Sequence, residues 1–203
     1  MLGKDWSLDS EEMNLLEDLV VLPRKQQVCK KLEQALSELG SALQPYPLPE
    51  GILPGPVLAP KLSRGENYHS YAYRVLDQPR FHRGEDLFLF RTVILWGHPI
   101  GFHLIVTGEL KSKWESAFQA FLPQLPTGYF LSRQANPWLW EAHHPEQILL
   151  AKASDQLVKD VIEERAFIKV SYYLALDELD QLISKGRNIW TEWHAFFHHI
   201  AEN

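Results

Sequence analysis

Apolar residues recur at helical spacing near both ends of the chain. Near the start, two leucine-rich stripes are separated by Pro23, and near the end aromatic and aliphatic residues form a third. Residues three and four apart share one helix face. We therefore predict a helical segment over residues 1–44 and an amphipathic helix over residues 188–200. The stripes are Leu15, Leu16 and Leu19; then Val28, Leu32, Leu36, Leu39 and Leu43; and finally Ile189, Trp190, Trp193, Phe196, Phe197 and Ile200.

The middle of the chain has the pattern of strands. Residues 86–96 are apolar on both faces, which is typical of a central strand covered on both sides. A turn at Gly97-His98-Pro99 predicts a hairpin with residues 100–108. This order predicts an α+β fold, in which helices pack on an antiparallel sheet. The other expected strands are residues 71–77, 129–132 and 167–176, and the other expected helices are residues 110–122, 154–165 and the segment from 177 onward.

Prolines concentrate between the N-terminal helices and the first strand. Six of the thirteen prolines fall in residues 45–60. Proline lacks a backbone donor and fixes φ, so this stretch is predicted to be an extended connector. Residues 78–85 contain Pro79 and are expected to form a loop. Gly186 is expected to interrupt a helix, because glycine disfavours helix interiors. We interpret the chain as a single domain, residues 1–203, with its main body over residues 61–203.

Composition and charge exclude several classes of protein. The formal net charge is −6, whereas a general nucleic-acid binder needs a surplus of Lys and Arg on one face. Cys29 is the only cysteine, which excludes an internal disulfide and a cysteine-based zinc cluster. The polar, acidic start is unlike a signal peptide, and no run approaches the roughly 18 apolar residues of a membrane span. We expect a cytoplasmic protein that binds neither nucleic acid nor membrane.

The densest set of groups able to bind a ligand lies around the start of the sheet. Arg91 interrupts an otherwise apolar strand, where a charge needs a carboxylate or a ligand anion as its partner. The candidate carboxylates are Glu66, Asp77 and Glu109. A structural ion pair and an anion site remain alternatives, because bidentate arginine serves both. The candidate ligand-binding residues are Arg64, Glu66, Asn67, Tyr68, Arg74, Arg91 and Trp96, with Tyr68 and Trp96 as aromatic walls.

A second candidate site lies on the last helix. His194 and His198 are four apart, so they share a face and can chelate one ion, for which zinc is the candidate. The residues between them do not form the His-Glu-x-x-His pattern of zinc hydrolases. A third ligand has to come from elsewhere, from His143, His144 or His199. The alternative is that these are surface histidines of a terminal helix.

Four sequence segments carry a resemblance to known proteins. The runs PKLSRGENY (residues 60–68) and YRVLD (73–77), followed by FRT (90–92) and WG (96–97), resemble a family of hypothetical proteins from bacteria of the Bacteroidetes type. The resemblance implies a bacterial, cytoplasmic protein. It implies no activity, cofactor or catalytic residue, so no site is carried over from it.

Binding groups are plentiful along the chain, whereas no phosphate loop, dinucleotide-binding glycine pattern or nucleophile elbow is present. We therefore predict a binding protein without catalytic chemistry, whose ligand is a small molecule or a protein partner. One alternative is an enzyme assembled only in three dimensions, such as a metal-assisted hydrolase using His194 and His198. Another is an interaction subunit, suggested by Trp138, Trp140 and the leucine-rich N-terminal helices. The oligomeric state stays open, a homo-oligomer included.

Overall fold

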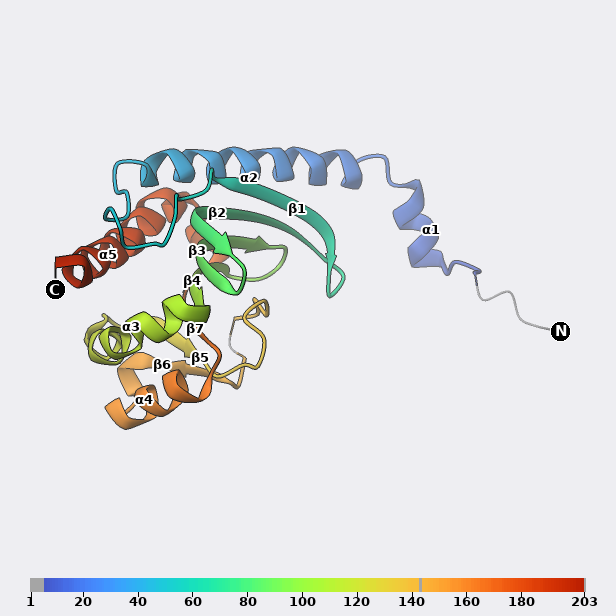
Figure 1. The fold of residues 1–203 in the computed structure, drawn as a ribbon. Helices are drawn as coiled ribbons and strands as arrows, with labels where there is room; N and C mark the ends of the chain where they lie inside the picture. Colours follow the sequence, from blue (N-terminus) through green and yellow to red (C-terminus); the bar gives the residue numbers. More distant parts are fainter. Residues whose placement is uncertain (1–5, 143, 203) are drawn as a thin grey trace.

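Seven antiparallel strands form one sheet in the computed structural model, which describes residues 6–142 and 144–202 (Figure 1). The strand order is β1-β2-β3-β4-β7-β5-β6, and the predicted α+β class is confirmed. Strands β1 to β4 pair in the order of the chain, and β7 returns to pair with β4. The strands are β1 (Lys61–Tyr68), β2 (Tyr71–Arg83), β3 (Asp86–Leu95), β4 (Ile100–Thr107), β5 (Tyr129–Ser132), β6 (Gln147–Leu149) and β7 (Phe167–Leu174).

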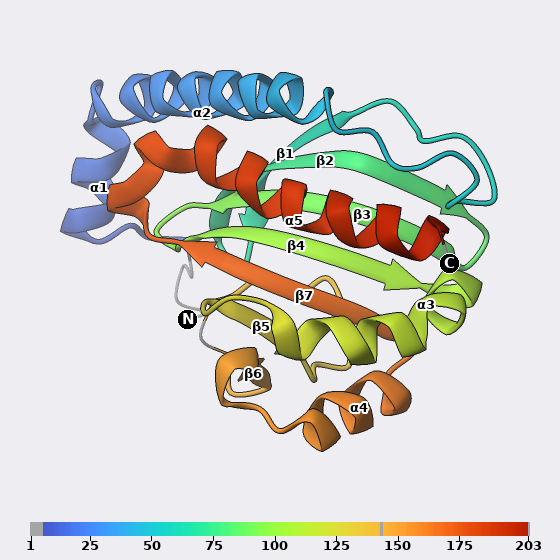
Figure 2. The same ribbon diagram turned by 90° about the vertical axis from the view of Figure 1, so that its left-hand side faces the viewer.

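Helices cover one face of this sheet (Figure 2). The long helices α2 and α5 pack against each other, and α2 also contacts β2. No helix in the described part of the chain is long and apolar enough to cross a membrane. The helices are α1 (Ser10–Glu17), α2 (Val21–Leu43), α3 (Gly108–Phe121), α4 (Asp155–Glu164) and α5 (Leu182–Glu202), with short 3₁₀ turns η1 (Leu122–Gln124), η2 (Leu150–Lys152) and η3 (Leu176–Gln181).

The main hydrophobic core lies between the helices and the sheet. Alternate residues of β3, among them Phe88 and Phe90, point into it, because successive side chains of a strand face opposite sides. The apolar stripe of α5 closes the core from above: the ring of Phe197 lies 5.2 Å from that of Phe88, and the ring of Trp190 lies 5.2 Å from that of Phe90. The predicted C-terminal amphipathic helix is therefore confirmed.

A loop covers the opposite face of the sheet. Within residues 133–146, Trp140 packs against a small buried cluster of Val75, Val93 and Leu95. Strand β3 is thus central and covered on both faces, as its two apolar faces predicted.

Three local predictions are wrong. The polar run Lys61–Tyr68, expected to precede the sheet, is strand β1; as an edge strand it keeps its polar side chains in solvent. The loop expected at residues 78–85 is mostly strand, since a register shift between Asp77 and Arg80 accommodates Pro79. Gly186 does not interrupt α5. A Cβ there would lie 2.8 Å from side-chain carbons of Leu39 and Phe102, so the glycine permits close packing.

Candidate functional site

Helix α2 has two halves with different surroundings. Its C-terminal half buries Leu32, Leu36, Leu39 and Leu43 in the main core. Its N-terminal half runs beyond the core, over the end of the sheet where β1 turns into β2 (Figure 1). Val28, predicted to belong to the same buried stripe, is exposed. The predicted stripe is therefore buried only from Leu32 onward, and the preceding turns of α2 overhang a surface that they do not fill.

Three adjoining hollows lie beneath this overhang and share lining residues. The most apolar hollow has a volume of about 280 Å³ and shares Cys29 and Arg74 with the second, and Val28, Ala72 and Trp96 with the third. We call the continuous depression the α2 groove. It is lined by side chains from residues 21–33, 70–74 and 94–97, together with Arg64, Glu66, Leu176 and Leu179.

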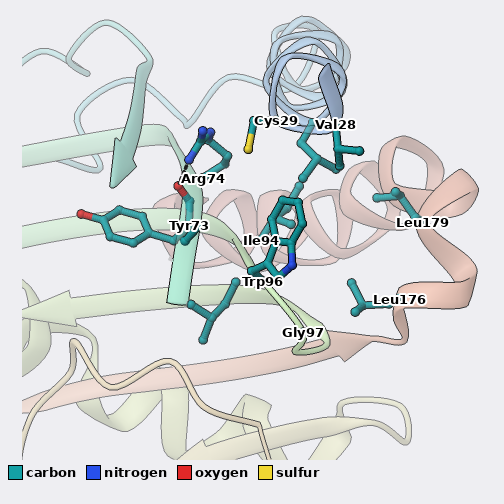
Figure 3. Close-up of a pocket in the computed structure, with 12 residues that line it drawn as sticks. Val28, Cys29, Tyr73, Arg74, Ile94, Trp96, Gly97, Leu176 and Leu179 are labelled. Carbon is teal, nitrogen blue, oxygen red and sulfur yellow. Dashed lines mark hydrogen bonds between the residues drawn. The ribbon is translucent and has the colours of Figure 1, made fainter. Parts of the chain in front are cut away.

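The apolar part of the α2 groove lies between α2, the end of β3 and η3 (Figure 3). Val28 comes from α2, Trp96 follows β3, and Leu176 and Leu179 come from η3. Val28, Trp96 and Leu176 are exposed although each has a large apolar side chain. A concave surface with such walls is the usual form of a site for an apolar ligand or peptide side chain.

The polar end of the α2 groove is organised by Arg74. Its guanidinium is buried and lies 2.7 Å from Glu33 Oε1 and 3.2 Å from Glu66 Oε1. Lys25 Nζ donates a second bond to Glu66, at 2.7 Å, and this bond holds the pKa of the Glu66 carboxyl below its usual value. Both carboxylates are therefore engaged by cations of the protein itself.

Basic residues outnumber acidic residues around the α2 groove. Five basic residues line its hollows against two acidic ones, Glu33 and Glu66. Arg24 and Lys30 form no ion pair within the described residues, and Arg64 reaches Glu33 only at 3.8 Å. The five basic residues are Arg24, Lys25, Lys30, Arg64 and Arg74.

The structure divides the predicted ligand-binding residues between two faces of the sheet. Arg64, Glu66, Arg74 and Trp96 line the α2 groove. Asn67 lies near the end of β1, and its side chain accepts a bond from the N–H of Ser70 in the β1–β2 turn at 3.3 Å. The remaining two, Tyr68 and Arg91, lie under the loop on the opposite face. One site containing all seven residues is therefore excluded.

The opposite face carries a row of polar side chains across four strands. Cross-strand pairing places Asp77 next to Arg91, Arg91 next to His103, and His103 next to Ser171. Arg91 makes a bidentate ion pair with Asp77, at 2.6 and 2.9 Å, so one of the three candidate carboxylates is its partner. His103 Nδ1 lies 2.8 Å from Ser171 Oγ. The guanidinium of Arg91 also lies 4.8 Å from the ring centroid of Trp138.

Burial changes the ionisation of this row and its neighbours. His103 is fully buried, and burial lowers the pKa of its imidazole well below the usual value, with further lowering by Lys169 and Arg91. Burial also lowers the pKa of Lys169 to about 7; its ammonium donates to the Leu139 carbonyl of the covering loop. Tyr68 donates to Glu141 and accepts from the Trp140 N–H, and burial raises its pKa to about 12.

The row of polar side chains stabilises the fold and does not form a site open to a ligand. His103 and Ser171 are covered by the loop and almost fully buried, so a substrate has no access to either. Some buried polar atoms, among them His103 Nε2 and Gln134 Nε2, have no hydrogen-bond partner among the described protein atoms. Arg91 joins the row to the covering loop through the rings of Trp138 and Trp140, and the neighbouring Lys169 and Tyr68 hydrogen-bond to the same loop.

The histidines of the last helix lie next to each other. The rings of His194 and His198 have centroids 4.3 Å apart, and burial lowers the pKa of His194. Within residues 6–142 and 144–202, no three His, Cys, Asp or Glu side chains come close enough to hold a metal ion. Of the candidate third ligands, His144 instead accepts a bond from the Glu146 N–H, and His143 lies outside the described residues.

No protein-family model matches the chain, and no curated protein or solved structure is significantly similar to it. The resemblance to Bacteroidetes-type proteins stays a prediction. The sequence did not indicate the groove residues of α2 and η3, because a leucine or valine at helical spacing looks the same in a core and in a groove. The available signal was the unbroken run of apolar residues from Leu19 to Leu22, which only Pro23 separates from the basic residues Arg24 and Lys25.

Proposed function

We propose that this protein binds, without catalysing a reaction, an apolar segment that carries negative charge, and that the α2 groove is its site. The observation that carries the proposal is the juxtaposition of an apolar hollow of about 280 Å³ with a surplus of basic side chains. The hollow is near the lower end of the roughly 300–1,000 Å³ typical of ligand pockets. It fits a few apolar side chains or one small ring system.

A binding function agrees with the chemistry of the groove. Its nucleophile, Cys29, has no histidine beside it among the described residues that line the groove. Its carboxylates, Glu33 and Glu66, are paired with Arg74 and Lys25 of the protein itself, so neither is free to contact a substrate proton. We retain a bacterial, cytoplasmic origin as part of the proposal, on the resemblance alone.

A fluorescent dye provides the direct test. The probe is 8-anilinonaphthalene-1-sulfonate, whose apolar rings and sulfonate match the groove, and whose fluorescence rises when it leaves water. We expect Val28→Asp to weaken dye binding about tenfold or more, because a carboxylate then faces both the apolar hollow and the anionic probe. Arg64→Ala should weaken it by a smaller factor.

Val57→Asp is the matched control. Val57 is 47% exposed, against 38% for Val28, and lies in the connector outside the groove. The control should bind the dye as the wild type does. Equal dye affinity in the Val28 and Val57 variants would refute the α2 groove as the site.

A further inference from the structure

The N-terminal arm, residues 8–20, exposes apolar side chains that the described part of its own chain does not cover. No residue of α1 is buried, and Leu16 and Leu19 are 70% and 87% exposed. The helix is nevertheless well defined locally, since Asp9 and Glu12 form a reciprocal capping box at its start. A short capped helix with an uncovered apolar surface is typical of an element that binds another surface. Its exposed apolar residues are Leu8, Met13, Leu15, Leu16, Leu19 and Val20.

The bend between α1 and α2 is held in place by Asp18. Its Oδ1 accepts bonds from the backbone N–H groups of Val20, at 2.6 Å, and of Val21, the first residue of α2, at 3.0 Å. These bonds also hold the pKa of the Asp18 carboxyl below its usual value. With the bend in this form, α1 lies beyond the end of α2 and is separated from the strands of its own chain (Figure 1). The apolar residues of the arm are thus left uncovered by the sheet.

The arm and the α2 groove are complementary in charge. Residues 8–20 contain five acidic residues and no basic one, whereas the groove is lined by five basic residues and two acidic ones. Opposite charge at the rim favours encounter and fixes orientation. The acidic residues of the arm are Asp9, Glu11, Glu12, Glu17 and Asp18.

The two surfaces also agree in form. At 1.5 Å per residue, α1 is about 12 Å long and the stretch of α2 that lines the groove is about 20 Å long. An amphipathic helix laid in an apolar groove is a common mode of peptide recognition. Each copy of the chain carries one arm and one groove, so arms and grooves are present in equal number.

We propose that the α2 groove binds the N-terminal arm of a second copy of this chain, and that two copies exchange arms to form a symmetric dimer. Reciprocal exchange closes the assembly, because each arm and each groove is then occupied. The inference rests on the proposed function of the groove and names its ligand.

The first test is the mass in solution, measured by light scattering on size-exclusion chromatography. The wild type should be a dimer, and both the arm variant Leu15→Ser/Leu16→Ser/Leu19→Ser and the groove variant Val28→Asp should be monomers with unchanged circular dichroism. Asn14→Ser in the arm and Val57→Asp in the connector are controls that should stay dimeric. A monomeric wild type at up to about 100 µM, or a dimeric arm variant, would overturn the inference.

An equimolar mixture of the two monomeric variants separates arm exchange from direct pairing of two arms. The groove variant supplies an intact arm and the arm variant supplies an intact groove, so one of the two contacts is restored and a heterodimer should form. If two arms instead bound each other, no heterodimer should form in the mixture. Each heterodimer would contain one intact arm and one mutated arm. Failure of the mixture to associate would overturn the inference. Arg24→Glu is a second groove variant, which changes only a charge at the rim of the groove. It should also raise the dissociation constant of the dimer.

The dye titration distinguishes failure of this inference from failure of the proposed function. If the arm occupies the groove, the arm variant should bind the dye more tightly than the wild type. A monomeric wild type that binds the dye through Val28 would leave the proposed function standing and remove the second copy as ligand. An arm variant that does not bind the dye in the groove would refute the proposed function itself.

Discussion

The two ends of the chain carry the same kind of helix in opposite surroundings. Both α1 and α5 have apolar stripes at helical spacing. In α5, Trp190 and Phe197 are buried against the sheet; in α1, Leu15 and Leu16 lie in solvent. The spacing of apolar residues thus predicts that a helix packs against an apolar surface. It does not predict whether that surface belongs to the same chain.

The first and largest effect expected from this comparison is on stability. Trp190→Ala should lower the free energy of unfolding by about 3–5 kcal/mol, because it removes a large buried ring from the core. Leu16→Ala, measured at a concentration low enough to keep the chain monomeric, should change it by less than about 0.5 kcal/mol. Urea denaturation followed by circular dichroism measures both. A large loss of stability in the Leu16 variant would mean that the arm packs on its own chain.

A second contrast concerns ion pairs. Asp77→Ala should destabilise the fold by about 3 kcal/mol, since it leaves the Arg91 guanidinium under the loop without its carboxylate. Arg64→Ala, at the exposed rim of the α2 groove, should cost less than about 0.5 kcal/mol. The same denaturation experiment compares them. Equal effects would contradict the distinction between a closed structural face and an open binding face.

A third, smaller effect depends on pH. In the unfolded chain Lys169 keeps its proton up to its ordinary pKa of 10.5, whereas in the folded protein the pKa is lowered to about 7. Between these values the unfolded state binds more protons, so stability rises with pH. We expect a gain of about 2 kcal/mol from about pH 7 to pH 9. Lys169→Met should abolish this rise; an unchanged slope in that variant would assign the effect to another group.

The smallest effect is expected at the bend. Asp18→Ala removes the acceptor of the Val20 and Val21 N–H groups and frees the direction of the arm, so the dimer should dissociate a few-fold more readily while the melting temperature of the body stays the same. Asp18→Asn is the matched control, because the asparagine side-chain oxygen can accept the same two bonds. Sedimentation equilibrium of the three proteins measures the difference. Identical dissociation constants would show that the fixed bend does not contribute.

Most of the fold could be predicted from the sequence, because the spacing of apolar residues indicates which face of a helix or strand is buried. The two apolar faces of residues 86–96 indicated a central strand, and the stripe of residues 188–200 indicated a buried helix. Strand β1 was missed because an edge strand pairs on one side only and needs no apolar face. The continuity of α5 through Gly186 was missed because it depends on how closely Leu39 and Phe102 approach.

The sequence grouped the candidate ligand-binding residues only partly as the structure does. Arg64, Glu66, Arg74 and Trp96 lie near one another, since they are on paired strands and at a strand end. Arg91 was grouped with them although strand alternation places it on the opposite face, because Ile94, the cross-strand partner of Arg74, lies an odd number of residues from Arg91 in β3. The groove itself forms because α2 extends over the sheet. That tertiary arrangement cannot be predicted from the spacing of residues along the sequence.

The most direct measurement of the central claim is a photo-cross-link from the arm. Leu16 is replaced by p-benzoylphenylalanine in an equimolar mixture of light- and heavy-isotope-labelled protein, and cross-linked peptides are identified by mass spectrometry. Arm exchange predicts mixed light–heavy cross-links between the arm and peptides that contain Val28 or Trp96. Cross-links confined to one isotope form, or links from arm to arm, would contradict the account.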